Sequence, residues 1–331
     1  MNRVVSGIRS TGNLHLGNYF GAVKNFLKMQ YEHDCYFFVA DYHSLTTHPK
    51  PQDLQDNVKT VLVEYLACGL DPEASTLYVQ SDIPEISELY LILNMLAYKG
   101  ELERVATFKE KVRKHPDNVN AGLLTYPVLM ATDIIIQKAD KVPVGKDQEQ
   151  HLEMTRNFVN RFNNLYGVDF FPEPVAFNFG QELIKIPGLD GSGKMGKSEG
   201  GKNAVYLSDE PEVIKKKVMR AVTDSGPTEK NQQKPEVIQN LFTLMSVVSP
   251  EETMRYFEEQ YNNMTIRYGD MKKELAADMI KFVEPIRDRI RDLEKNDKYL
   301  GEVREKGAEK ARATARETLR GVRDIIGVNP K

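Results

Sequence analysis

The first 190 residues alternate short apolar runs with longer segments of helical spacing. Residues 4–5, 35–40 and 76–80 are rich in β-branched and aromatic side chains, which is typical of buried strands. Residues 17–32 and 53–68 repeat apolar side chains three and four positions apart, which predicts helices. This alternation predicts a parallel sheet with helices on both faces. Further helices are expected over 85–98, 121–137 and 147–162, with another short strand at 142–144.

The pattern changes after about residue 190. Residues 188–201 are rich in Gly, Ser and Lys, which predicts a loop. Nearly all of the chain beyond this loop has helical spacing, so we expect an α/β domain over 1–187 and a helical region over 188–331. The expected helices of this region cover 210–222, 236–248, 251–261, 268–294 and 301–326.

Composition narrows the class of protein. The chain has 331 residues, of which 40% are hydrophobic, and a formal net charge of −3, which excludes a disordered protein. Its two cysteines are too few for a disulfide scaffold or a four-thiolate metal site. The N-terminal segment lacks a signal peptide's apolar core, and the run Cys35–Ala40 is too short to span a membrane. We therefore expect a cytoplasmic protein without a membrane partner.

A first phosphate-binding candidate is the segment SGIRSTGNLHLGNYFGA, Ser6–Ala22. It follows the first predicted strand and opens the first predicted helix, where backbone N–H groups and the helix dipole attract anions. His15 and Asn18 add side-chain donors at the same place. The segment favours a nucleotide site, and a glycine-rich turn with a solvated histidine is the alternative.

A second candidate is GSGKMGKS, Gly191–Ser198, which matches the P-loop pattern G-x-x-x-x-G-K-[ST]. A P-loop continues at once into a helix, whereas Glu199-Gly200-Gly201 follow here and adjacent glycines are poor helix formers. The segment therefore favours a loop whose two lysines hold a polyphosphate, and a P-loop NTPase stays as an alternative.

The segments HLGN and KMGKS resemble the HIGH and KMSKS signatures of class I aminoacyl-tRNA synthetases. Longer stretches are similar to bacterial-type tryptophanyl-tRNA synthetases. The related tyrosyl family usually carries a GGSDQ-like stretch where this chain has VGKDQ (Val144–Gln148), although a tyrosyl-type enzyme remains an alternative. The stretches are GNYFGAV (17–23), GELERVATFKEK (100–111), GLLTYPVLMATDII (122–135), VPVGKDQEQHLEMTRNFVNRFN (142–163) and KMGKSEGGKNAVYL (194–207).

The resemblance implies a Rossmann-like catalytic domain over 1–187, followed by the lysine loop and a helical anticodon-binding domain over 188–331. It implies a ligase that activates L-tryptophan with ATP and transfers it to the 3′ end of tRNA(Trp). It further implies a homodimer, and Mg²⁺ carried by the ATP phosphates. Some relatives carry an iron–sulfur cluster, which this chain with two cysteines cannot hold, and we expect no zinc or other protein-held metal.

The resemblance also assigns a tryptophan pocket. Asp133 accepts the indole N–H in this assignment, with Met130 one helical turn away on the same face. Gln148 lies near the substrate ammonium. Asp133 could instead pair within the domain, and His43 could be a core histidine. The full set is Val5, Gly7, His43, Met130, Asp133, Val142, Val144 and Gln148.

The assigned catalytic residues are His15, Asn18, Lys111, Lys194 and Lys197, with the lysines neutralising the β- and γ-phosphates. The implied ATP site is larger. It comprises Arg9, Ser10, Thr11, Gly17, Asn18, Gly145, Lys146, Asp147, Ile186, Lys194, Met195, Gly196, Lys197 and Ser198.

Three positions depart from the family's usual pattern. Gly196 replaces a serine, Arg9 stands where glutamine is frequent, and Val5 stands where an aromatic residue often lines the indole pocket. We therefore expect a looser lysine loop and a thinner pocket wall.

Two basic clusters are candidates for contact with tRNA. Arg312, Arg316, Arg320 and Arg323 recur at spacings of four, four and three on the last predicted helix, and Lys215–Lys217 with Arg220 form the second cluster. A solvated helix face is the alternative for the arginine stripe.

Overall fold

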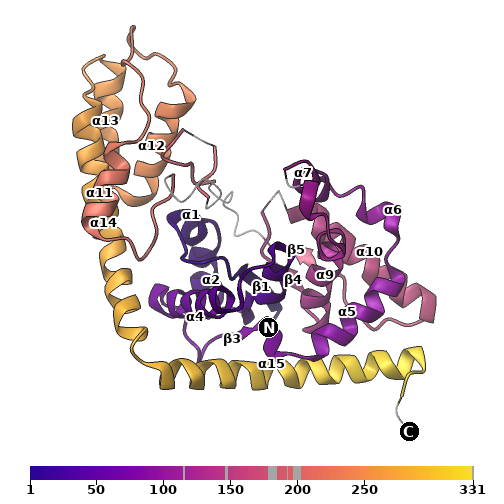
Figure 1. Ribbon diagram of the computed structural model, residues 1–331. Coiled ribbons are helices and arrows are strands. Elements are labelled where there is room, and N and C mark those ends of the chain that lie inside the picture. Colours follow the sequence, from indigo (N-terminus) through magenta and orange to yellow (C-terminus); the bar gives the residue numbers. More distant parts are fainter. Residues whose placement is uncertain (115, 146–147, 178–184, 192, 197–202, 330–331) are drawn as a thin grey trace.

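The computed structural model describes residues 1–331 except 115, 146–147, 178–184, 192, 197–202 and 330–331. Its five described strands form one parallel sheet in the order β3-β2-β1-β4-β5 (Figure 1), as the pattern of the sequence predicts. The strands are β1 (Arg3–Arg9), β2 (Asp34–Ala40), β3 (Thr76–Val79), β4 (Lys141–Val142) and β5 (Val175–Ala176). The predicted strand 142–144 stops at Val142, since Pro143 has no N–H to donate.

Successive residues of the central strands face opposite sides of the sheet, so two apolar cores form. Val4 and Phe37 join the core beneath α4, whereas Val5 and Phe38 join the core beneath α5, α9 and α10. The short helices before β2 are α1 (Leu16–Asn18), η1 (Tyr19–Val23) and α2 (Lys24–Met29). The others are α3 (Asp41–Ser44), η2 (Leu45–Thr47), α4 (Pro51–Cys68), η3 (Gln80–Asp82), α5 (Glu85–Leu96), α6 (Lys99–Leu102), α7 (Ala106–Lys114), η4 (Pro116–Asn118), α8 (Ala121–Leu124), α9 (Tyr126–Ile136) and α10 (Glu149–Tyr166).

One predicted helix, 121–137, is two helices in the structure. The break falls at Thr125, two residues before Pro127, because a proline nitrogen cannot donate inside a helix. The pattern also missed α6 and α7. None of the residues of α7 is buried, and five of its nine residues are charged, so it offers few apolar positions to a sequence pattern.

The helical region confirms the predicted helices, with bounds that differ by a few residues. It contains α11 (Pro211–Met219), α12 (Glu236–Val248), α13 (Glu251–Asn262) and α14 (Tyr268–Leu293). Its apolar residues continue the core of the α4 face without a break. At the junction, Phe282 of α14 stacks on Phe20, with ring centroids 5.2 Å apart.

The last helix, α15 (Asp297–Ile326), turns back beneath the α/β domain and passes under β3 (Figure 1). Ala311, Ala315 and Leu319 are buried in the core beneath α5 and α9. The helix meets β3 so closely that a Cβ atom on Gly307 would lie 1.7 Å from the carbonyl oxygen of Leu77. Only glycine permits this approach.

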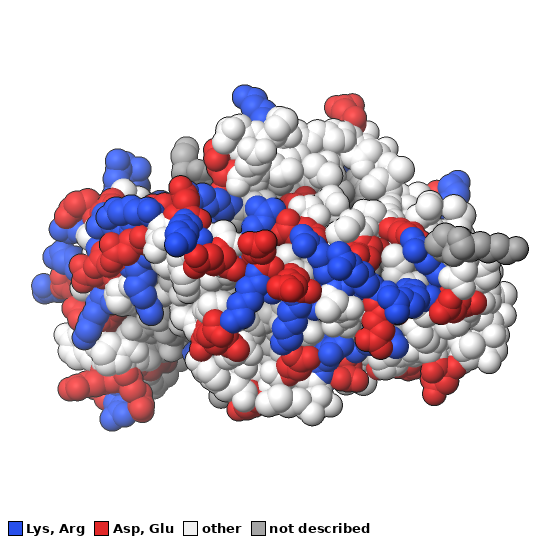
Figure 2. Space-filling model, turned by 90° about the horizontal axis from the view of Figure 1, so that it is seen from below, with Lys and Arg blue, Asp and Glu red and all other residues white. Residues whose placement is uncertain are grey.

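The arginine stripe of α15 contacts the α/β domain. Arg316 bonds Glu85 at 3.0 Å, Arg323 bonds Glu88 at 2.6 Å, and Arg312 donates to the carbonyl oxygen of Asp82 at 2.6 Å. Seen from below, Lys and Arg side chains are interleaved with Asp and Glu rather than gathered into one basic patch (Figure 2). These contacts place Arg312, Arg316 and Arg323 at the junction between the helix and the domain, and their contact with tRNA stays a prediction.

Candidate active site

A pocket of about 230 Å³ opens where β1 and β2 end, which is where open parallel sheets bind their ligands. The structure brings all the residues assigned to tryptophan binding into its wall, from segments far apart in the chain. They are Val5, Gly7, His43, Met130, Asp133, Val142, Val144 and Gln148.

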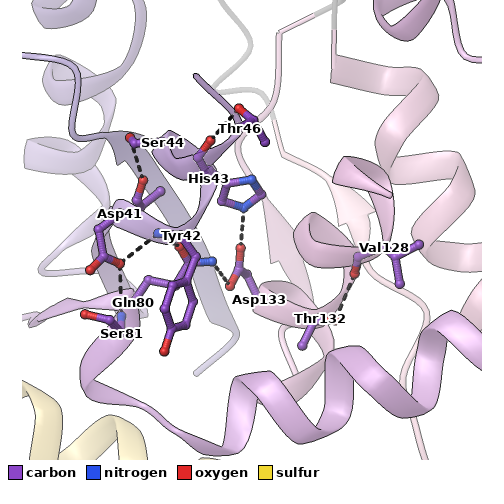
Figure 3. A network of polar contacts seen from close by, with 11 residues as sticks. Asp41, Tyr42, His43, Ser44, Thr46, Gln80, Ser81, Val128, Thr132 and Asp133 are labelled. Atoms are coloured by element: carbon purple, nitrogen blue, oxygen red, sulfur yellow. Dashed lines mark hydrogen bonds and ion pairs between the residues drawn. The ribbon is translucent and has the colours of Figure 1, made fainter. Parts of the chain in front are cut away.

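The polar centre of the pocket is the buried carboxylate of Asp133 (Figure 3). Its Oδ2 lies 2.8 Å from Nε2 of His43, and its Oδ1 accepts from Nε2 of Gln80 at 2.7 Å. Gln80 is itself fixed, because its Oε1 accepts the backbone N–H of Tyr42 at 3.1 Å. Burial raises the pKa of the Asp133 carboxyl, and the bonds from His43 and Gln80 oppose that shift. Both alternatives for Asp133 and His43 are therefore realised together: they pair within the domain and also line the pocket.

Six wall residues escaped the sequence analysis. Phe38 lies opposite Gly7 in the strand register and supplies an aromatic wall, although Val5 suggested a thin one. The alternation of apolar residues in β2 is the signal that could have found Phe38. Tyr126 lies inside one of the stretches that carry the family resemblance. The six are Ser6, Phe38, Ala40, Tyr126, Ile134 and Pro143.

Two cationic groups lie at or beside the pocket. Arg9 lines it, and within the described residues its buried Nε and NH2 atoms have no hydrogen-bond partner. Nζ of Lys111 lies 4.8 Å from the ring centre of Tyr126, another wall residue. Burial, followed by the charge of Arg9, lowers the pKa of Lys111. Such an arrangement suits an anionic ligand.

Gln148 is held from the side of α10. Nδ1 of His151 lies 2.9 Å from its Oε1, and Nε2 of the same ring lies 3.0 Å from Oγ1 of Thr107. His151 is buried, and these contacts give each ring nitrogen a protein partner. Neither His151 nor Thr107 was singled out from the sequence.

The HLGN segment bonds the chain that follows the KMGKS segment, nearly 190 residues later. Leu16 N–H donates to Val205 O and Leu207 N–H to Leu14 O, each at 2.9 Å. A Cβ atom on Gly17 would lie 2.8 Å from Nδ1 of His15, which explains the glycine at this position. The HLGN segment is thus fixed next to the chain that leaves the lysine loop.

His15 and Asn18 cap the first helix reciprocally. The His15 ring accepts the N–H of Asn18 at 3.2 Å, and the Asn18 side chain accepts the N–H of His15 at 3.1 Å. This capping box holds both side chains at the start of α1. The local sequence therefore positions two polar side chains at this helix end.

Of the remaining residues assigned to ATP, those that the structure describes come from several segments of the chain. Ser10 is buried and bonds Ser44 at 3.0 Å, Thr11 N–H donates to Arg9 O, and Met195 N–H donates to Ile186 O at 2.7 Å. Lys194 is exposed. Gly145 accepts the N–H of Gln148 through its carbonyl, and Gly196 is described as partly exposed. Lys146, Asp147, Lys197 and Ser198 lie outside the described residues.

The chain after Gly191–Ser198 does not support a P-loop. Residues 203–210 form turns and a bridge in which Tyr206 pairs with His15, and the next described helix, α11, begins at Pro211. A P-loop would continue straight into its helix.

Two further searches cover the described part of the chain only. No helix there is long and apolar enough to cross a membrane. Within the same residues, no three His, Cys, Asp or Glu side chains lie together as metal ligands.

Comparison with known proteins places the geometry in a family. The family model for class I tRNA synthetases (W and Y) matches residues 1–284. The tryptophan–tRNA ligase of Porphyromonas gingivalis is 61% identical over 327 residues and covers 99% of both chains, and that of Fusobacterium nucleatum is 40% identical over 330 residues, covering 99% of this chain and 98% of its own. A solved structure of tryptophanyl-tRNA synthetase from Campylobacter jejuni, complexed with ADP and tryptophan, has a TM-score of 0.86 at 33% identity and covers 98% of this chain and 99% of its own. The chain therefore belongs to the class I tRNA synthetases for tryptophan and tyrosine and, within them, to the tryptophan–tRNA ligases.

Proposed function

We propose that the pocket at the ends of β1 and β2 activates L-tryptophan with ATP and then transfers it to tRNA(Trp). The carboxylate of tryptophan attacks the α-phosphate, which gives tryptophanyl-adenylate and pyrophosphate. The terminal ribose hydroxyl of the tRNA then attacks the activated carbonyl. The observation that carries this assignment is a buried carboxylate, Asp133, inside an apolar pocket whose rim holds Arg9 and Lys111.

The indole end reads the single polar group of the substrate side chain. Indole offers one N–H donor and no strong acceptor, and each oxygen of Asp133 has a lone pair beyond the bond it already accepts. Phenylalanine would leave that acceptor buried without its partner, which is costly. Apolar walls from Val5, Met130 and Val144 complete the recognition.

Gln148 lies in the wall of the same pocket, and we assign it to the substrate ammonium. The amide oxygen can accept from the ammonium, and the ring of Tyr126 offers its π-face to the same cation. Together they orient the carboxylate of tryptophan toward the cationic rim.

ATP binds, in this proposal, across the start of α1. His15 and Asn18 face the nucleotide, and Met195 and Gly17 lie beside each other there. Arg9, Lys111 and Lys194, with Lys197, neutralise charge that grows on the phosphates as pyrophosphate leaves. Mg²⁺ enters on the ATP phosphates, since carboxylate cages are not its usual way into nucleotide sites. No protein nucleophile is required, so positioning and charge stabilisation supply the catalysis.

We further propose that a second copy of the chain covers the exposed face of α5. Leu91 and Met95, one turn apart on that helix, are 57% and 74% exposed, and Tyr98 is 62% exposed. Apolar side chains gathered in this way mark an interaction surface. Replacing Leu91 and Met95 by glutamate should convert a dimer into monomers, as measured by analytical sedimentation.

The tRNA binds, in this proposal, the helical region of the chain. The enzyme then works in the cytoplasm, together with the tRNA pool.

Tryptophan-dependent exchange of pyrophosphate into ATP tests the activation step. The expected result is rapid exchange with tryptophan and very little with tyrosine or phenylalanine. Exchange supported by tyrosine alone would overturn the assigned specificity. ATP hydrolysis without any amino acid would favour an NTPase instead.

A further inference from the structure

Two buried histidines lie against the ring of Tyr126. The ring centroid of His43 is 4.6 Å away and that of His151 is 5.7 Å away. His43 bonds Asp133, the residue assigned to the indole N–H. His151 bonds Gln148, the residue assigned to the ammonium. Each polar contact proposed for tryptophan thus has its own histidine behind it.

His151 also contacts a second helix. Its Nε2 atom lies 3.0 Å from Oγ1 of Thr107 on α7, and Lys111 follows one turn later on that helix. A neutral ring with its proton on Nδ1 satisfies both contacts, since Nδ1–H donates to Gln148 and Nε2 accepts from the Thr107 hydroxyl. The two ring nitrogens therefore connect the amino-acid side of the site to the helix that carries a phosphate-binding lysine.

Helix α7 combines polar contacts with limited apolar packing. None of its residues is fully buried, and Phe108 packs, partly buried, against the core beneath α5 and α9. Its N-terminal end is bonded to α10 twice, by Thr107 to His151 and by the N–H of Ala106 to Oε1 of Gln150 at 3.1 Å. One turn after Thr107, Nζ of Lys111 lies 4.8 Å from the ring centre of Tyr126.

We propose that His151 is a positioning residue for tryptophan activation. Through Nδ1 it fixes Gln148, and through Nε2 and Thr107 it fixes α7 with Lys111. The groups that hold the ammonium and the phosphates therefore keep one relative placement, which in-line attack of the carboxylate on the α-phosphate requires. This inference rests on the proposed roles of Gln148 and Lys111.

The decisive variant is Thr107→Val, which keeps the shape of the side chain and removes the hydroxyl. Loss of one hydrogen bond should lower kcat/KM for ATP in pyrophosphate exchange about fivefold. The KM for tryptophan should stay unchanged, because the Nδ1 contact with Gln148 is intact. Thr107→Ser restores the hydroxyl and should restore the rate. Equal losses in both variants would overturn the proposal, since packing and not the hydroxyl would then matter.

Two substitutions of His151 separate its two contacts. Counted in bonds from Cβ, an asparagine amide reaches the place of Nδ1 and a glutamine amide reaches the place of Nε2. His151→Asn should keep the KM for tryptophan and lose ATP efficiency, as Thr107→Val does. His151→Gln should raise the KM for tryptophan and spare ATP efficiency. If both variants change the KM for tryptophan and the kcat/KM for ATP to the same extent, His151 only supports the fold, and the proposal that it positions the two groups is wrong.

A double-mutant cycle with Lys111→Ala distinguishes this inference from the function on which it rests. Where Thr107 acts through Lys111, Thr107→Val should cost less than about twofold once Lys111 is gone. A full loss in that background would overturn the coupling. Normal exchange in Lys111→Ala alone would instead refute the role of Lys111. A slow Lys111→Ala with an unaffected Thr107→Val would refute only the positioning by His151.

Discussion

The pocket and the outer face along α15 both contain pairs of acidic and basic side chains, and the two sets differ in how far those side chains are buried. Asp133 and His43 approach within 2.8 Å, with their side chains 3% and 5% exposed. Arg316 and Glu85 approach within 3.0 Å, but the arginine side chain is 64% exposed. The distances are alike, so burial decides what each pair contributes. Removing one partner of the buried pair leaves a polar group without solvent, whereas water replaces a partner at the surface.

This difference in burial gives the pocket and the α15 face different roles. The buried network of Asp133, His43 and Gln80 has no alternative partners, so it can reject a substrate that lacks an N–H. In the pairs along α15 the arginines reach solvent, although Asp82 and Glu85 are only 16% and 11% exposed, and these pairs fix where the helix lies. The distances between the paired atoms alone would not distinguish the two sets of pairs.

The largest expected effect is at the buried end. Asp133→Ala removes the acceptor for the indole N–H and leaves His43 and Gln80 facing each other without it. We expect kcat/KM for tryptophan to fall at least about 100-fold, because breaking a buried pair is strongly unfavourable. The preference over phenylalanine should fall with it, measured by pyrophosphate exchange with each amino acid. Asp133→Asn keeps one acceptor oxygen, so its kcat/KM for tryptophan should lie between that of the unchanged chain and that of Asp133→Ala. Retained discrimination in Asp133→Ala would remove burial as the source of specificity.

Lys111 is intermediate in burial between the Asp133 network and the α15 arginines, since its cation is partly buried over the Tyr126 ring. Lys111→Ala should slow adenylate formation about 100-fold, the scale of losing one transition-state donor. The affinity for tryptophan should change little. Since the chain contains no tryptophan, bound substrate is the only indole, and its fluorescence reports binding separately from the rate.

The same lysine gives a pH signature. Burial and Arg9 lower the pKa of Lys111, so the charged form is lost at a lower pH than for an ordinary lysine. Activation should therefore fall as the pH rises through that lowered value. Lys111→Arg keeps its charge and should lose this alkaline decline. An unchanged alkaline limb in Lys111→Arg would assign the decline to another group.

Gln80→Met is expected to have a smaller effect. It removes one bond to the Asp133 carboxylate while keeping the length of the side chain, so the KM for tryptophan should rise about tenfold. Losing that bond also raises the pKa of Asp133, so tryptophan binding should be lost at a higher pH on the acid side. Fluorescence titration at several pH values measures both effects. Gln30→Met replaces another buried glutamine, outside the pocket, and should leave both unchanged.

The sequence predicted the pocket far better than the surface, and the reason is physical. Strand and helix periodicity, with the resemblance, assigned Asp133, Met130 and the valine walls, because such residues belong to long continuous stretches. Gln80 and His151 were missed, since Gln80 acts through Asp133, 53 residues later in the chain, and His151 contacts Thr107, 44 residues earlier. Neither has a local pattern that differs from that of an ordinary buried polar residue.

The fold shows the same limit. The central strands and the helices of the terminal region follow from periodicity, whereas β5 has two residues and α7 has nine, of which five are charged, so neither offers a long apolar repeat. The partners of the α15 arginines lie about 230 residues earlier in the chain. Spacing within a helix cannot reveal a partner on another element, so the stripe was open to a tRNA interpretation.

The smallest effects are expected on that stripe. Arg304→Ala and Arg316→Ala each remove an exposed arginine from a carboxylate that is only 16% or 11% exposed, so each should lower the free energy of unfolding by about 1 kcal/mol. High salt should reduce the difference further, because screening weakens exposed pairs. The KM for tRNA should not change, as these side chains already face the α/β domain. Arg220→Ala, in the basic cluster at the end of α11, is the matched comparison, and we expect it to raise the KM for tRNA. A raised KM in Arg316→Ala would show that α15 binds tRNA despite its pairs, and burial would then no longer separate the two regions.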